Sequence, residues 1–372
     1  MPTSRSGIRI SGSSPSVPEL AMTLDDLLDV AHPFLIRLAV PFRGVSERVG
    51  VIFIGPQGWG EFAPFPDYDD AAASRWLDCA VEAAFGSWPP SRVPSVGVNA
   101  IIPAVSIDGC LELVSAALAH GQTVFKVKVG LAEQDDLQRI HAIVEFLAAQ
   151  SQLPSWALRL DANGAWPAEH AIGMLRQLDQ QHPGIVDTAI EYLEQPTTDI
   201  EGLRMIREQT GVKIAVDELL RRSPDPFAIV DQVRSCADLI ILKAAPLGGV
   251  RRCIDLARAI DLPVVISGSL DSSVGLGPAL ALAGALGVER ACGLGTSALL
   301  ATDLCDPPAL PTSGRLQVGR PEGSVERLAM AHKELTSEQR AQLLQRVAQA
   351  WNAGTAQRWP ELVQPDWTAG LG

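Results

Sequence analysis

Five ionisable residues follow short apolar segments of the chain and could act together in one reaction. They recur at intervals of about one strand-helix unit, in the order Lys128, Asp161, Glu194, Asp217 and Lys243. Three carboxylates contributed by three strands suit Mg²⁺ or Mn²⁺ better than zinc, because those ions prefer oxygen ligands. Such a cation can hold a substrate carboxylate and stabilise the enediolate that forms when the α-proton leaves. The pattern therefore predicts metal-assisted abstraction of a proton from a carboxylic acid.

Lys128 is the expected base. Lys126 lies two residues earlier, and a strand would direct both side chains to the same face. A lysine accepts a proton only when it is neutral, and the like charges of Lys126 and the cation are expected to lower the pKa of Lys128. Lys243 is expected to approach from the far side, as a second acid/base or as a cationic stabiliser.

The elements that must position these residues are short strands separated by helices. From Val96 onward eight short apolar segments recur, and most are followed by a stretch with helical periodicity, such as residues 131–150 and 249–260. This alternation predicts right-handed βαβ units and an α/β fold with a parallel sheet. Eight strands in about 200 residues suit a closed barrel, whose active site lies at the carboxyl ends of the strands.

The rest of the chain has a different pattern. The segment before the barrel alternates apolar and polar residues, has a turn signal at 55–58 and a helical period over 69–85, and so predicts a small antiparallel meander with a helix. Residues 324–353 are amphipathic and helical in period. We expect a disordered tail (1–20), a small α+β domain (33–95), the barrel (96–305) and a C-terminal segment (306–372). The C-terminal segment is expected to return to the small domain and to carry this helical extension.

Composition excludes several classes of protein. The net charge of −13 opposes binding to nucleic acid. The apolar run at 274–288 contains a proline and several glycines and is shorter than the roughly 20 residues that a bilayer requires. The six scattered cysteines are expected to be buried thiols, because they form no CxxC pair. Together with the lack of a signal-peptide pattern in this sequence, these features predict a cytoplasmic protein with a small-molecule substrate and no nucleic-acid or membrane partner; they do not specify an oligomeric state.

Several motifs carry a resemblance to a known family. The order KxK, DxN, LEQP, VDE and a strand-borne lysine resembles the muconate-lactonizing subgroup of the enolase superfamily. Within it, the chain is similar to the o-succinylbenzoate synthase family over about residues 33–318. The motifs of that similarity are FRGVSERVG (42–50), GWGEFAPFPDYDD (58–70), LRLDANGAW (158–166), APLGGV (245–250), VVISGSLDSSVG (264–275) and CGLGTSALLATDL (292–304).

The resemblance implies a modified TIM barrel, (β/α)₇β, under a small α+β capping domain. It implies Mg²⁺-dependent syn-dehydration of 2-succinyl-6-hydroxy-2,4-cyclohexadiene-1-carboxylate to o-succinylbenzoate, a step of menaquinone biosynthesis. In that reaction Lys128 would take the α-proton and then protonate the departing hydroxyl, with Lys243 opposite. The other residues matched to the family are the metal ligands Asp161, Glu194 and Asp217, the auxiliary Lys126, and Arg159 beside the metal-binding strand.

Substrate contacts are expected from a further group of residues. Ser267, Gly268 and the loop containing Gly293 would hold the succinyl end, and Asn163 would contact the substrate. Arg43, in the first turn of the capping domain, is either a plain surface arginine or a contact to the succinyl carboxylate.

Some alternatives stay open at this point. An N-acylamino-acid racemase or dipeptide epimerase on the same scaffold would use the same two lysines, and a catalytically silent binding protein would be expected to have lost one of the five residues. Leu219 stands where the superfamily often has serine. Glu191 is expected to point away from the metal, and Glu218 could pair with a lysine.

Overall fold

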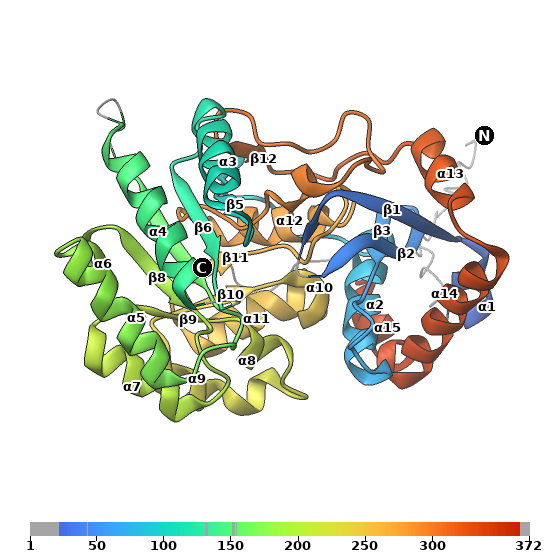
Figure 1. Cartoon of the computed structure of the whole chain (residues 1–372). Helices are drawn as coiled ribbons and strands as arrows, with labels where there is room; N and C mark the ends of the chain where they lie inside the picture. Colours follow the sequence, from blue (N-terminus) through green and yellow to red (C-terminus); the bar gives the residue numbers. More distant parts are fainter. Residues whose placement is uncertain (1–21, 43, 131–132, 151–152, 154, 365–372) are drawn as a thin grey trace, which may run out of the picture.

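The computed structural model describes residues 22–42, 44–130, 133–150, 153 and 155–364. The predicted tail, residues 1–20, and Arg43 lie outside these residues. Figure 1 shows two units: a capping domain, whose strands are blue, and a barrel in teal to orange, with the red C-terminal helices beside the capping domain.

The capping domain is built on an antiparallel meander. Its strands are β1 (Ala31–Phe42), β2 (Val45–Gly55) and β3 (Gly58–Phe62), and they pair in that order. The turn between β2 and β3 uses Gly58 at a φ of +138°, a conformation that only glycine adopts readily. Helix α2 (Asp70–Phe85) begins where Asp69 accepts the N–H of Ala72 at 2.7 Å, as is typical of an N-cap. The short helix α1 (Leu24–Asp29) precedes the meander.

Seven parallel strands form the barrel sheet, in the order β11-β10-β9-β8-β7-β6-β5. Their bounds are β5 (Ala100–Ile102), β6 (Val124–Lys128), β7 (Ala157–Asp161), β8 (Ile190–Glu194), β9 (Ile214–Val216), β10 (Leu239–Leu242) and β11 (Val264–Ile266). The two edges are joined through Cys292 and Gly293, which bridge in parallel to Val98 and Ser267 respectively. This short segment stands in place of the eighth predicted strand and closes the ring.

Helices cover the outside of the barrel (Figure 1). They are α3 (Ile107–Ala119), α4 (Glu133–Ala148), α5 (Ala168–Gln181), α6 (Ile185–Thr188), α7 (Ile200–Thr210), α9 (Val230–Cys236), α11 (Val250–Ile260) and α12 (Leu276–Leu286). Two short helices, α8 (Glu218–Arg221) and α10 (Ala244–Leu247), instead follow the carboxyl ends of β9 and β10 at the mouth of the barrel, where α10 packs on α2. None of the helices in the described ranges is both long and apolar enough to cross a membrane. All six cysteines are buried and free, as predicted.

The inside of the barrel holds a separate apolar cluster that positions the polar residues above it. Its members are Tyr192, Ala215, Leu239, Ile241 and Val265. Strand side chains alternate with a period of two. For four members of the cluster, the residue two positions later in the chain therefore projects from the same inner face, one layer nearer the carboxyl ends of the strands. Those residues are Glu194, Asp217, Lys243 and Ser267.

The C-terminal segment packs on the capping domain. Strand β12 (Arg315–Gln317) first pairs with β4 (Ser95–Gly97) beside the barrel. The predicted helical stretch is divided into α13 (Val325–Lys333) and α14 (Ser337–Ala350), because Thr336 forms a capping box that starts a new helix. Val347 and Trp351 then share a buried cluster with Trp76 of α2. A π-helical turn (Trp351–Thr355) leads into the last helix, α15 (Ala356–Leu362).

A buried carboxylate joins the capping domain to the barrel. Glu82 of α2 accepts the N–H groups of Val250 at 2.5 Å and Arg251 at 3.1 Å, at the start of α11. A Cβ on Gly249 would lie 2.5 Å from this carboxylate, so the close approach requires glycine. Burial raises the pKa of Glu82 to about 7 from its ordinary 4.5, despite these two hydrogen bonds.

We therefore expect the folded protein to hold the Glu82 proton more tightly than the unfolded chain does. Since the folded-state pKa is the higher one, this group's contribution to stability is complete below pH 4.5 and is lost as the pH rises toward 7. The loss should approach about 3 kcal/mol. Urea unfolding at pH 5 and pH 8 should show this loss in the parent chain and not in Glu82→Gln. An identical pH dependence of the two proteins would contradict the role assigned to Glu82.

Candidate active site

A cavity of about 330 Å³ lies between the capping domain and the carboxyl ends of the barrel strands. The capping domain contributes Val45, Phe65, Pro66, Asp67, Tyr68 and Trp76 to its lining. The barrel contributes Ile101, Lys126, Lys128, Arg221, Arg222, Lys243, Ser267, Gly268, Ser269, Leu270 and Thr296. All three lysines of the sequence prediction therefore reach one cavity.

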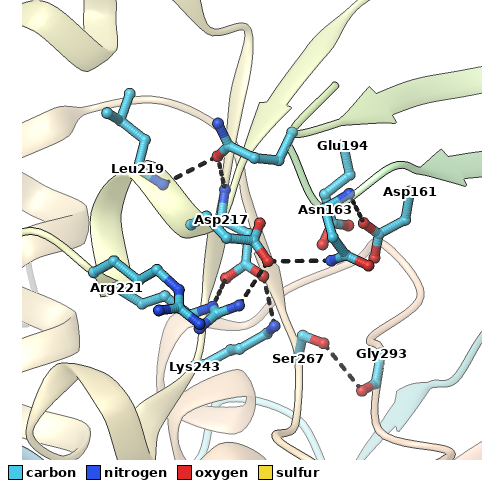
Figure 2. Close-up of polar contacts among 12 residues, drawn as sticks. Asp161, Asn163, Glu194, Asp217, Leu219, Arg221, Lys243, Ser267 and Gly293 are labelled. Atoms are coloured by element: carbon cyan, nitrogen blue, oxygen red, sulfur yellow. Dashed lines mark hydrogen bonds and ion pairs between the residues drawn. The ribbon is translucent and has the colours of Figure 1, made fainter. Parts of the chain in front are cut away.

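The three predicted carboxylates end adjacent strands and are fully buried. Asp161 and Glu194 are register partners at the ends of β7 and β8, and Asp217 directly follows β9. Each has 0% exposed surface. Figure 2 shows the three side chains converging on one region of the barrel. The sequence spacing alone predicted that these three residues end successive strands.

The lysines pair with these carboxylates from opposite sides of the ring. Lys126 Nζ lies 2.8 Å from Asp161 Oδ2 and 2.7 Å from Glu194 Oε1, and Lys128 Nζ contacts the same oxygen of Asp161. Lys243 Nζ lies 2.6 Å from Asp217 Oδ2 (Figure 2). Lys128 ends β6 and Lys243 follows β10, which are four strands apart in the sheet order. In a ring closed by an eighth segment, these positions face each other.

The charges in this cluster compete, and the pKa values show which effect prevails. Burial lowers the pKa of Lys126, but Asp161 and Glu194 outweigh it and hold that pKa well above its usual range. Burial likewise raises the pKa of Asp161, but Lys126 and Lys128 outweigh it and hold it well below its usual range. For Asp217, Arg221 and Lys243 overcome burial in the same way and lower the pKa. Glu194 differs, because burial and the charge of Asp161 raise its pKa to about 7.

The donor set fits a divalent cation. Glu194 Oε2 is buried and has no hydrogen-bond partner in the described part of the chain. Asp161 and Asp217, at the ends of the neighbouring strands, are buried too, and such an oxygen-only set is what hard divalent ions prefer. The Lys128 contact with Asp161 favours the charged amine. A cation that takes up the charge of Asp161 would weaken this effect and help Lys128 to become a neutral base.

Gln195 and Arg221 fix the position of Asp217. The side-chain oxygen of Gln195 accepts the N–H groups of Asp217 at 3.0 Å and Leu219 at 3.1 Å. Leu219 contributes its backbone to this contact, so the absence of serine there leaves the contact intact. Arg221 donates to Asp217 Oδ1 at 3.0 Å and contacts the hydroxyl of Tyr68 in the capping domain.

Three residues of the cavity lining, Arg221, Arg222 and Tyr68, were not predicted from the sequence. One signal was present for Arg221, because it lies four residues after Asp217 and a helical turn brings such residues together. Nothing in the local sequence pairs Tyr68 with the barrel, since the two segments are far apart in the chain.

The glycine and serine residues predicted to contact the substrate lie at the β11 end. Ser267 and Gly268 line the cavity. Gly293 lies behind them, where its carbonyl accepts the N–H of Gly268 at 3.0 Å and the hydroxyl of Ser267 at 3.3 Å (Figure 2). A Cβ on Gly293 would lie 2.6 Å from Ser267 Oγ, so any larger residue would displace the Ser267 hydroxyl.

Asn163 lies between two charged partners, Lys128 and Glu218. Its side-chain oxygen is 3.2 Å from Lys128 Nζ, and its amide donates to Glu218 at 3.1 Å. Glu218 also contacts Arg221 at 2.6 Å. Glu218 therefore pairs with an arginine and an asparagine, and not with the lysine that the sequence suggested.

Arg159 is not brought to the cavity. Its guanidinium lies 2.7 Å from Glu191, 2.8 Å from the side-chain oxygen of Asn99 and 2.6 Å from the carbonyl of Ala291, near the beginnings of the strands. The expectation that Arg159 acts among the catalytic groups is therefore not supported by its position, and we assign it no step. Glu191 points away from the carboxylates, as expected, and also pairs with Arg290 at 2.6 Å.

Comparisons with known proteins agree with this architecture. Residues 34–84 match the family described as enolase N-terminal domain-like, and residues 110–324 match the enolase C-terminal domain-like family. The solved L-Ala-D/L-Glu epimerase from Bacillus subtilis superposes with a TM-score of 0.65 at 21% identity, over 79% of this chain and 96% of the epimerase. The muconate lactonizing enzyme from Pseudomonas fluorescens gives 0.63 at 18% identity, over 81% of this chain and 97% of that one. These structures confirm the predicted barrel and capping domain.

Sequence similarity is closer to another group of enzymes. The o-succinylbenzoate synthase of Thermobifida fusca (strain YX) is 40% identical over 300 residues, which cover 80% of this chain and 89% of the relative. That of Mycolicibacterium smegmatis is 39% identical, over 79% of this chain and 87% of the relative. This chain therefore belongs to the o-succinylbenzoate synthase family of the enolase superfamily.

Proposed function

We propose that the protein dehydrates 2-succinyl-6-hydroxy-2,4-cyclohexadiene-1-carboxylate to o-succinylbenzoate, a carbon–oxygen lyase reaction of menaquinone biosynthesis. The observation that carries the proposal is the pair of lysines, Lys128 and Lys243, which line one cavity from opposite strands. They contact Asp161 and Asp217 respectively, two of the three buried carboxylates at the strand ends. Family membership at 40% identity favours the dehydration over other reactions that the same geometry could support.

Enzymes of the enolase superfamily bind a divalent metal, and here Asp161, Glu194 and Asp217 would hold it. We infer Mg²⁺, with Mn²⁺ as a substitute, because all three ligands are oxygens. When bound, the cation neutralises negative charge that develops on the substrate carboxylate as the α-proton leaves. A cytoplasmic location belongs to the same proposal.

Lys128 performs both proton transfers. Its neutral amine takes the proton from C1 of the ring, and the electron pair of the broken C–H bond remains on the substrate. That pair then forms the new ring double bond as the C6–O bond breaks, and the ammonium of Lys128 returns the proton to the departing hydroxyl, which leaves as water. One base can serve both steps because the proton and the hydroxyl leave from the same face. The product ring is aromatic, and no oxidant or reductant is consumed.

The other polar residues hold this geometry. Lys126 bridges Asp161 and Glu194 and keeps the two carboxylates together. Lys243 places a positive charge on the opposite face of the substrate, where it stabilises the developing anion. Ser267 and Gly268 would hold the succinyl end at the β11 side of the cavity, with Gly293 supporting them, and Asn163 would contact the substrate beside Lys128.

The test compares two reactions of the Mg²⁺-loaded protein. We expect rapid conversion of the cyclohexadiene acid, followed by the change in ultraviolet absorbance as the ring becomes aromatic. N-succinyl amino acids, assayed by polarimetry, should turn over at least about tenfold less efficiently, because the two lysines permit 1,1-proton transfer but the family favours the elimination. Negligible dehydration with robust racemisation would replace the proposal with an N-acylamino-acid racemase.

A further inference from the structure

A second cluster of metal-ligating side chains lies in the outer helical layer of the barrel. His141 and Glu145 are one turn apart on α4, so they project from the same face of the helix. His182 directly follows α5, which packs beside α4 (Figure 1). His141 and Glu145 are exposed, and 13% of the His182 side-chain surface is exposed, so an ion could approach the three from the side of His141 and Glu145.

The side chains of this cluster already converge. Nδ1 of His141 lies 2.8 Å from Nε2 of His182, and the two ring centroids are 4.9 Å apart. Nδ1 of His182 lies 3.5 Å from a carboxylate oxygen of Glu145. One ligand atom from each residue lies within 4.8 Å of the other two.

The spacing of the two imidazole nitrogens is close to what a tetrahedral metal requires. Two imidazole nitrogens bound to one zinc ion at 2.0–2.1 Å are separated by about 3.3 Å. The 2.8 Å contact must therefore open by about half an ångström, which a small rotation of the exposed His141 ring allows. At present the two nitrogens can share only one proton, and two charged rings would repel each other. A cation between the lone pairs would remove that conflict.

We propose that His141, Glu145 and His182 form a surface site for a borderline transition metal such as Zn²⁺. Two nitrogens and one carboxylate suit zinc, whereas the three buried carboxylates at the ends of β7, β8 and β9 suit Mg²⁺. The net charge of −13 raises the local concentration of cations. The bound metal would fasten the end of α5 to α4 and leave its fourth position to water. This site is separate from the proposed dehydration and does not depend on it.

The test uses the tag-free full chain, stripped of metal and then saturated with Mg²⁺ to occupy the carboxylate site. Co²⁺ is titrated as a spectroscopic substitute for zinc, because tetrahedral Co²⁺ with nitrogen ligands absorbs visible light far more strongly than six-coordinate Co²⁺ with oxygen ligands. We expect one equivalent to give the intense spectrum and Zn²⁺ to abolish it by displacement. His141→Ala and His182→Ala should each weaken binding at least about 100-fold, and Glu145→Gln about tenfold.

Two controls make the result specific. His120→Ala removes another exposed histidine, whose ring contacts the carbonyl of Ala116, and should leave Co²⁺ binding unchanged. Zn²⁺ should raise the melting temperature of the parent chain and of His120→Ala, but not of His141→Ala, while all three keep their activity in Mg²⁺. Equal Co²⁺ binding by the parent chain and both His141 and His182 variants would overturn the proposal, as would a parent spectrum of the weak, six-coordinate kind only.

Discussion

Replacing Lys128 with alanine is expected to lower kcat for the dehydration by about 10⁴-fold. General acid–base catalysis by one residue contributes roughly 10²–10⁴-fold, and the upper end applies because Lys128 both removes the proton and protonates the leaving hydroxyl. The variant should bind the divalent cation at least as tightly as the parent chain, since Asp161 loses a lysine that competes for its charge. Steady-state kinetics and calorimetric titration with Mg²⁺ measure the two effects separately.

The matched control is Lys213→Ala, which removes an exposed lysine immediately before β9. Its kcat should equal that of the parent chain. Retention of dehydration within about tenfold of the parent by Lys128→Ala would show that another group is the base, with Lys243 the first candidate because it lies across the same cavity.

Asp217→Asn is expected to weaken binding of Mg²⁺ at least about 100-fold. Loss of a residue that merely supports a ligand costs about 10–100-fold in metal affinity, and here a charged ligand itself is neutralised. The fold should survive, because asparagine has the same shape and its oxygen can still accept the hydrogen bond from Arg221, now at 3.0 Å from Asp217. Calorimetric titration measures the affinity, and circular dichroism with thermal unfolding monitors the fold.

Asp187→Asn serves as the control, because Asp187 is exposed on the short helix α6. It should leave both the Mg²⁺ affinity and the activity unchanged. Equal Mg²⁺ affinity in Asp217→Asn and the parent chain would show that Asp217 is not a metal ligand. It would contradict a metal site made of three carboxylates.

The elements that hold the site follow strong local patterns, which is why they could be predicted. The strand ending in Lys128 and the one ending in Asp161 each place two polar residues on alternate positions after an apolar start, and the period of two fixes their common face. The turn at Gly55–Gly58 was predicted from its turn residues, and the helix over 69–85 from its helical period. The helix α1 has only six residues and depends on the capping box of Thr23, so no long periodicity identified it.

The position of Arg159 could not be predicted in the same way. Alternation places Arg159 on the face that also holds Asp161, but a long side chain on that face can extend toward either end of the barrel. The register between β7 and β8 shifts beside Arg159, between the partners Ile190 and Tyr192, and Glu191 then meets the guanidinium. A register shift of this kind depends on strand pairing, which the local sequence does not encode.

Contacts between segments that are far apart in the chain could not be predicted from the sequence either. Tyr68 reaches Arg221 because the capping domain closes over the barrel. Glu82 meets the start of α11 for the same reason. Each residue has an unremarkable local setting in the sequence, so its partner becomes visible only after the two domains are placed together.

The most direct measurement is a crystal structure with Mn²⁺ and o-succinylbenzoate, using anomalous scattering to locate the metal. We predict one manganese peak bonded to oxygens of Asp161, Glu194 and Asp217, with the product carboxylate beside it. The Nζ atoms of Lys128 and Lys243 should then lie on opposite faces of the aromatic ring. A manganese peak that none of these carboxylates touches, or a product with both lysines on one face, would contradict the account.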